Sequence, residues 1–168
     1  MLYRTRTYIA GDWTGDADLI NKLYEWNSNN YWALSFSDAH SLTQARDTSL
    51  PCSIKHSLAE RLNGSRTFVL IVGDQTADLR KGGCQYCYSY NSHTYSCARG
   101  HSTDYRSFIE FECEKAVRDN LKIVVIYNSS YVDRSKCPEK IRYMGTHIAA
   151  KKPYTYSWDY DSIKTAIV

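Results

Sequence analysis

Three glutamates at alternate positions are the residues whose type and spacing most favour chemistry. Glu110, Glu112 and Glu114 lie in the segment YRSFIEFECEKA, residues 105–116. Alternation at every second residue is the period of a β-strand, whereas the surrounding residues favour a helix, in which each residue turns by about 100°. Counted from Phe108, Glu112 falls at about 40°, while Glu110 and Glu114 fall at about 200° and 240°. A helix therefore separates one of these glutamates from the other two.

Glu112 is predicted to face the interior, and the other two glutamates to face solvent. The apolar face of the expected helix is formed by Phe108, Ile109, Cys113, Ala116 and Val117. An unpaired carboxylate on such a face is costly, and it usually finds a partner or shifts its pKa. In the structural interpretation, Glu112 pairs with an arginine or reaches water at the edge of the stripe. In the functional interpretation, it lies at the wall of a cleft, where apolar neighbours fix its direction and tune its basicity.

The composition is that of a folded soluble domain. The chain has 168 residues, of which 43% are hydrophobic and 23% charged, so we expect residues 1–168 to form one domain. A net charge of +3, without clustered Lys and Arg, argues against a nucleic-acid surface. The longest apolar runs, FVLIV and IVVIY, have the length of strands and not of a membrane span.

The start of the chain has no apolar run typical of a signal peptide. We therefore expect a cytoplasmic protein that binds no membrane. In that compartment the six cysteines should be reduced thiols or metal ligands, not a disulfide framework.

Strand and helix patterns alternate along the chain. Strands are predicted at residues 6–11, 31–36, 67–73, 122–127 and 145–150, and helices at 15–27, 51–64, 105–116 and 159–168. Asp16 is the expected N-cap of the first helix. This alternation predicts an α/β fold, a doubly wound parallel sheet of about five strands with helices on both faces. The length favours a flavodoxin-like strand order over the longer dinucleotide-binding fold, whose GxGxxG motif is absent.

A binding crevice is expected at the carboxyl ends of these strands. With a flavodoxin-like order, the switch point lies between the first strand, which ends in GDWT (11–14), and the third, which ends in GDQT (73–76). The second strand leads into a long polar loop, residues 37–50. The candidate binding residues from these three segments are Gly11, Asp12, Trp13, Asp38, His40, Arg46 and Asp74. Glycines, carboxylates and an aromatic ring suit a nucleotide better than a peptide or a lipid, although Asp12 and Asp74 also suit caps or turns.

An insertion at about residues 77–104 precedes the glutamate helix. It holds Cys84, Cys87 and Cys97, together with His93 and His101. A CxxC pair with further Cys and His is a zinc-binding composition, but the spacing after the first pair matches no familiar zinc module. These cysteines are therefore weak metal candidates, and we expect a metal-free lid over the crevice. The alternative is a passive surface elaboration.

The region from residue 67 to residue 127 resembles bacterial TIR-like domains, most closely the TIR component of Thoeris antiphage systems. That branch has an apolar strand, a Gly-polar-polar-Thr turn, a stretch of the type Ser-aromatic-Val-x-aromatic-Glu and then an Ala. The matching residues here are Gly73, Thr76, Ser107, Phe108, Ile109, Phe111, Glu112 and Ala116. The frequent tryptophan of the family is Phe108 here, and the insertion is much longer than usual.

The resemblance implies an enzyme that cleaves the nicotinamide–ribose bond of NAD, with Glu112 as the catalytic carboxylate. Thr76, Ser107 and Phe108 join the candidate substrate-binding residues on this basis. The product would be an ADP-ribose-derived nucleotide, cyclic or transferred, that diffuses to a partner effector as a second messenger. NAD is then a substrate, no cofactor is needed, and self-association is a further expected interaction.

Two alternatives remain open at the level of the sequence. Some TIR domains act only as scaffolds in protein assemblies, so the family alone does not make an enzyme. Another nucleotide N-glycosidase, such as a nucleoside deoxyribosyltransferase, also uses a carboxylate in a flavodoxin-like fold.

Overall fold

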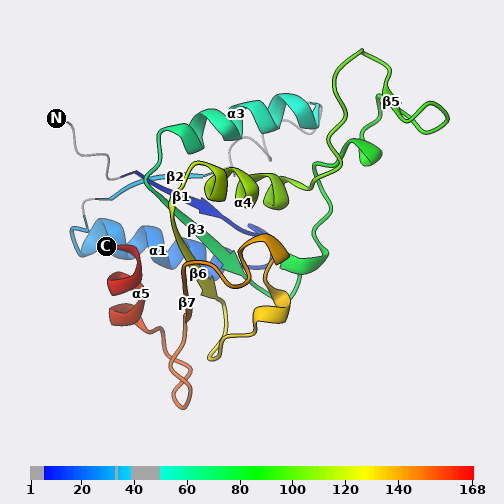
Figure 1. Cartoon of the computed structure of the whole chain (residues 1–168). Coiled ribbons are helices and arrows are strands. Elements are labelled where there is room, and N and C mark those ends of the chain that lie inside the picture. The colour runs from blue at the N-terminus through cyan, green and yellow to red at the C-terminus, as the bar shows by residue number, and fades with distance from the viewer. Residues whose placement is uncertain (1–5, 33, 39–49) are drawn as a thin grey trace.

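The protein is a doubly wound α/β fold built on a parallel sheet, as predicted. The computed structural model describes residues 6–32, 34–38 and 50–168. Its main sheet has the strand order β2-β1-β3-β6-β7, and all neighbouring pairs are parallel (Figure 1). The strands are β1 (Arg6–Ala10), β2 (Ser35–Asp38), β3 (Thr67–Val72), β6 (Lys122–Tyr127) and β7 (Thr146–Ala149). The strand order reverses between β1 and β3, where the sequence placed the switch point.

Helices cover both faces of the sheet. On one face lie α1 (Ala17–Asn29) and α5 (Tyr160–Ile167), and on the other lie α3 (Pro51–Asn63) and α4 (Phe108–Arg118) (Figure 1). Proline at the first position of α3 suits a helix start, because its missing N–H would have no partner there. All six residues of β3 are buried, as expected for a central strand covered on both faces.

Alternate residues of the strands divide between two apolar cores. Tyr8 of β1 and Phe68 of β3 stack in the core beneath α3 and α4, with ring centroids 6.0 Å apart. Ile9 and Val69 point the other way, into the core beneath α1 and α5. Each strand residue is therefore assigned to one side of the sheet, and this assignment decides which side chains can meet.

The strand predicted at residues 31–36 begins later than expected, at Ser35. Asn30 ends α1, and Tyr31 adopts a positive φ of 52°. The backbone of Leu34 is then held by the Asn27 side chain, which donates to the Leu34 carbonyl at 2.8 Å and accepts from its N–H at 3.2 Å. Because these bonds occupy the Leu34 backbone, pairing with β1 begins only at Ser35.

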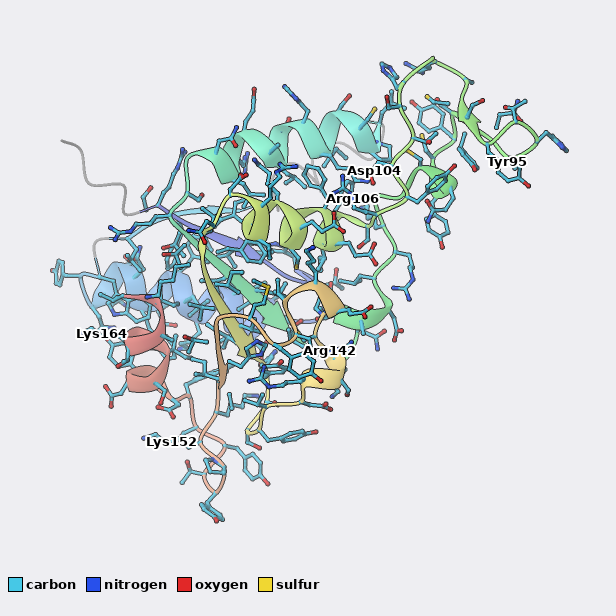
Figure 2. The ribbon with its side chains drawn as sticks, in the orientation of Figure 1. Tyr95, Asp104, Arg106, Arg142, Lys152 and Lys164 are labelled. Atoms are coloured by element: carbon cyan, nitrogen blue, oxygen red, sulfur yellow. The ribbon has the colours of Figure 1, made fainter. Side chains whose placement is uncertain are left out.

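The insertion forms an arm that extends away from the sheet (Figure 1). We define the arm as residues 83–104. It contains a short 3-10 helix, η2 (Cys84–Tyr86), and a small antiparallel hairpin of β4 (Tyr90–Asn91) and β5 (Ser96–Cys97). Tyr95 lies at its tip, and Asp104 lies where it joins the body (Figure 2).

Three further 3-10 helices follow strands of the main sheet. They are η1 (Thr76–Asp78), η3 (Arg134–Lys136) and η4 (Glu139–Ile141). The first follows β3, and the other two lie between β6 and β7. Among the described residues, no helix is long and apolar enough to cross a membrane.

Candidate active site

The helix that carries Glu112 begins at a complete capping box. The Ser107 hydroxyl accepts from the Glu110 N–H at 3.2 Å, and the Glu110 carboxylate accepts from the Ser107 N–H at 2.8 Å. These two bonds satisfy backbone donors that a helix start leaves unpaired. Ser107 and Glu110 thus define where α4 starts, and so which way its later residues point.

The helical phase predicted for the three glutamates is confirmed. Glu112 is buried, with 2% of its surface exposed, whereas Glu110 is exposed and Glu114 is partly exposed. Glu114 forms a 2.6 Å ion pair with Arg106 at the start of the helix. The alternate spacing of the glutamates therefore gives three different environments: a helix cap, a buried carboxyl group and a surface ion pair.

Burial raises the pKa of Glu112 to about 8, because its carboxylate loses its hydration on the buried face of α4. A hydrogen bond with the Tyr8 side chain partly offsets this shift by favouring the ionised form. Tyr8 belongs to β1, so the contact joins α4 to the strand beside the switch point. A carboxyl group with this pKa is largely protonated at neutral pH, and a nearby positive charge would ionise it.

At the switch point itself, the structure places a buried carboxylate that the sequence analysis had treated as a cap. Asp16 is at the N-cap position of α1 but makes no side-chain cap bond. Its Oδ1 instead accepts from the Asn128 side chain at 2.9 Å, and a Cβ on Gly73 would overlap the carboxylate. Burial raises the pKa of Asp16, an effect that the bond from Asn128 opposes. Only a glycine at position 73 leaves room for this arrangement.

The residues after β1 have local contacts of their own. The Asp12 carboxylate accepts from the Thr14 N–H at 3.0 Å, which closes a turn. Gly11 approaches β3 closely, since a Cβ there would lie 3.0 Å from the Cβ of Ile71. Trp13 is partly buried beside Tyr24 of α1, with ring centroids 6.5 Å apart. Trp13 thus packs with the core beneath α1 and α5, whereas Tyr8, the partner of Glu112, belongs to the core on the opposite face.

Two of the candidate residues, Thr76 and Ser107, lie at a cavity beside the start of α4. This cavity has a volume of about 590 Å³, and its walls come from the segment after β3, the start of α4 and the region of η4. Thr76 and Ser107 both line it, but Glu112 is not among its lining residues. Thr76 also closes the turn after β3 by accepting from the Gly73 N–H at 2.8 Å. Phe108 is buried and packs closely on Gly82.

Four other candidates have little or no described contact with this region. Asp74 is exposed and forms a 2.6 Å ion pair with Lys136. Asp38 ends β2, but its side chain is not described. His40 and Arg46 lie outside the described residues, so their predicted role stays a prediction.

A buried lysine clamps the base of the arm, and the sequence analysis missed it. Lys55 of α3 donates to the Arg106 carbonyl at 2.6 Å and lies 3.3 Å from the Asp104 carboxylate. Asp104 in turn binds the Arg106 guanidinium at 2.8 Å. We call Lys55, Asp104 and Arg106 the clamp. The sequence signal for the clamp was the position of Lys55 in the helical pattern. Lys55 follows Ile54 and lies three residues before Leu58, on the buried face of α3.

Comparison with known protein families agrees with this architecture. Residues 8–81 match the family described as Thoeris protein ThsB, TIR-like domain. A search of curated proteins gives no match. The parallel five-stranded sheet with helices on both faces, together with this match, defines the class as a TIR-like α/β fold. Residues 8–81 are therefore similar to the TIR-like domain of the Thoeris protein ThsB.

The family match ends before α4. It runs from within β1 to beyond β3 and includes Tyr8, Asp16 and the switch-point glycine Gly73, but not Glu112. Glu112 is therefore singled out by its burial and by the resemblance of residues 107–116, and not by the matched segment.

Proposed function

We propose that the protein cleaves the nicotinamide–ribose bond of NAD in the cytoplasm, with Glu112 as the catalytic carboxylate. The observation that carries this proposal is a buried carboxyl group on α4, in contact with the strand next to the switch point. The match of residues 8–81 to the Thoeris TIR-like domain supports it. The expected product is an ADP-ribose-derived nucleotide that activates a partner effector in antiphage defence.

The raised pKa of Glu112 suits a charged substrate. The nicotinamide ring of NAD is cationic, and a cation beside the carboxyl group favours its ionised form. As the glycosidic bond breaks, the positive charge moves from the ring to the ribose, and nicotinamide leaves as a neutral base that needs no general acid. A carboxylate held in an apolar setting then stabilises the charge on the sugar more strongly than it would in water. Tyr8 would hold the direction of the Glu112 carboxylate during this step.

The burial of Glu112 also favours a second candidate function. A group that is 2% exposed becomes available to a substrate only when neighbouring side chains move. If they do not move, Glu112 is a structural residue and the domain acts as a scaffold, through contacts with copies of itself or with other proteins.

Base release distinguishes these functions. Purified protein is incubated with NAD, and separately with nucleosides, over a range of protein concentrations, and free base is measured by chromatography. Nicotinamide release from NAD alone supports the proposal. Release from nucleosides alone identifies another N-glycosidase. The absence of release from either substrate at every concentration, together with self-association in sedimentation, favours the scaffold.

A further inference from the structure

The arm has almost no apolar core of its own. Its large side chains Tyr86, Tyr88 and Tyr95 are 64%, 69% and 72% exposed, and its hairpin has two residues in each strand. A two-stranded hairpin of this size is marginal in water without further support. Small excursions of this kind are usually stabilised by disulfides or by a metal ion. All six cysteines of the chain are free, so the arm has no disulfide.

Four of those cysteines surround one small cavity at the base of the arm. Cys84, Cys87 and Cys97 of the arm line it together with Cys52 of α3, and His101 lies beside them. The volume is about 10 Å³, which is close to the space that one water molecule or ion requires. The four cysteines are half-buried, whereas His101 is exposed. Sequence spacing did not reveal this set, because Cys52 comes from a different element, 32 residues before Cys84.

Backbone donors already point at two of these sulfurs. The Asp104 N–H donates to the Cys84 Sγ at 3.1 Å, and the Ser89 N–H donates to the Cys87 Sγ at 3.4 Å. Hydrogen bonds of this kind orient a sulfur ligand around a metal. Lys55 is also electrostatically coupled to Cys84 and lies at the same junction. Its positive charge would offset part of the negative charge of a four-thiolate site.

We propose that Cys52, Cys84, Cys87 and Cys97 bind one Zn²⁺ ion, which fastens the arm to α3. Four thiolates in a tetrahedron are a common structural zinc site, with Zn–S distances of about 2.3 Å. Among the described residues, no group of three metal-binding side chains is already arranged around one point. Binding of the ion would therefore move the four sulfurs toward one another across the cavity. Each thiol loses its proton to solvent on binding, and the site as a whole carries two negative charges. This proposal departs from the metal-free lid expected from the sequence, and it does not rest on NAD cleavage.

Zinc analysis of the whole chain tests the site. We expect one zinc per chain after purification in reducing buffer without chelator, and thiolate-to-metal absorption when Co²⁺ replaces the zinc. Loss of a ligand's hydrogen-bond partner weakens metal binding by roughly 10–100-fold. We expect a larger loss of Zn²⁺ affinity when a ligand itself is replaced, in each of the variants Cys52→Ser, Cys84→Ser, Cys87→Ser and Cys97→Ser. His93→Ala is the matched control, because His93 is an exposed residue of the arm that does not line the cavity. It should keep its zinc.

The Co²⁺ titration of the unmodified chain keeps the test independent of whether a variant folds. Wild-type protein that carries no zinc and gives no thiolate absorption overturns the proposal. Retention of zinc by Cys52→Ser together with its loss in His101→Ala also overturns it, because the site would then lie within the arm and would not fasten it to α3.

Discussion

The body and the arm of this protein are stabilised by different interactions. The body buries two apolar cores, one on each face of a five-stranded sheet, so burial of apolar surface dominates its stability. The arm exposes three of its four tyrosines and depends on a few polar contacts at its base, where Lys55 and Asp104 join it to α3. The same residue type, tyrosine, therefore has different roles in the two regions. Tyr8 is buried in the body against Phe68, whereas Tyr95 is 72% exposed at the tip of the arm.

The largest expected effect is on a buried polar group of the body. Glu112→Gln keeps the shape of the side chain but removes its charge, so we expect NAD cleavage to fall by roughly 10³-fold or more while the fold is retained. Nicotinamide release and circular dichroism measure the two quantities. Glu110→Gln is the matched control, since glutamine also supports a capping box and should change turnover little. Loss of activity in Glu110→Gln with normal turnover in Glu112→Gln would contradict the assignment.

The second prediction concerns the pH dependence of stability. Burial raises the pKa of Glu112 from its usual 4.5 to about 8, so the folded state holds a proton that the unfolded state releases. Protonated Glu112 therefore contributes to the free energy of unfolding at low pH. This contribution falls as the pH rises between these two values, by roughly 4 kcal/mol in total. Urea unfolding at intervals between pH 5 and pH 9 should therefore show a smaller decline in Glu112→Gln than in the wild type. Parallel curves for the two proteins would show that Glu112 ionises normally.

The third prediction weakens the link between arm and body. Lys55→Met should lower the free energy of unfolding by roughly 1–3 kcal/mol, because it leaves the Arg106 carbonyl and the Asp104 carboxylate short of a buried partner. Hydrogen exchange should rise at the base of the arm and remain slow in β3. Lys22→Met is the control, since Lys22 pairs with Glu25 at an exposed site and should change stability by less than about 0.5 kcal/mol. Equal effects of the two substitutions would show that the clamp does not stabilise the link between arm and body.

The smallest effect should come from the tip of the arm. Tyr95 and Asn120 both adopt positive φ, 52° and 55°, but Asn120 lies in the body, directly after the C-cap of α4. Asn120→Ala should destabilise the protein by about 1 kcal/mol, because alanine is strained in this conformation. Tyr95→Gly should leave the global free energy of unfolding within about 0.5 kcal/mol, since the tip unfolds separately. Chemical denaturation measures both, and a larger effect at Tyr95 would show that the arm folds as one unit with the body.

The sequence predicted those features of the fold that follow from local periodicity. Apolar runs located β3 and β6, and the spacing of Ile54, Leu58 and Leu62 located α3 between Pro51 and Gly64. The alternation of strands and helices predicted the parallel sheet and its switch point. The start of β2 was missed because a side chain, Asn27, took the backbone bonds of Leu34 that would have extended the strand.

The sequence by itself also determined the direction of Glu112, since a helix has a fixed turn per residue and its apolar face was clear. Only the tertiary structure decided what surrounds that glutamate. Tyr8 lies about a hundred residues earlier in the chain. The pKa of Glu112 depends on burial by elements that periodicity does not pair. The same holds for Cys52, which joins the cysteines of the arm only because α3 packs beside α4. Local spacing fixes where one side chain points, but only the packing of distant elements fixes what it meets.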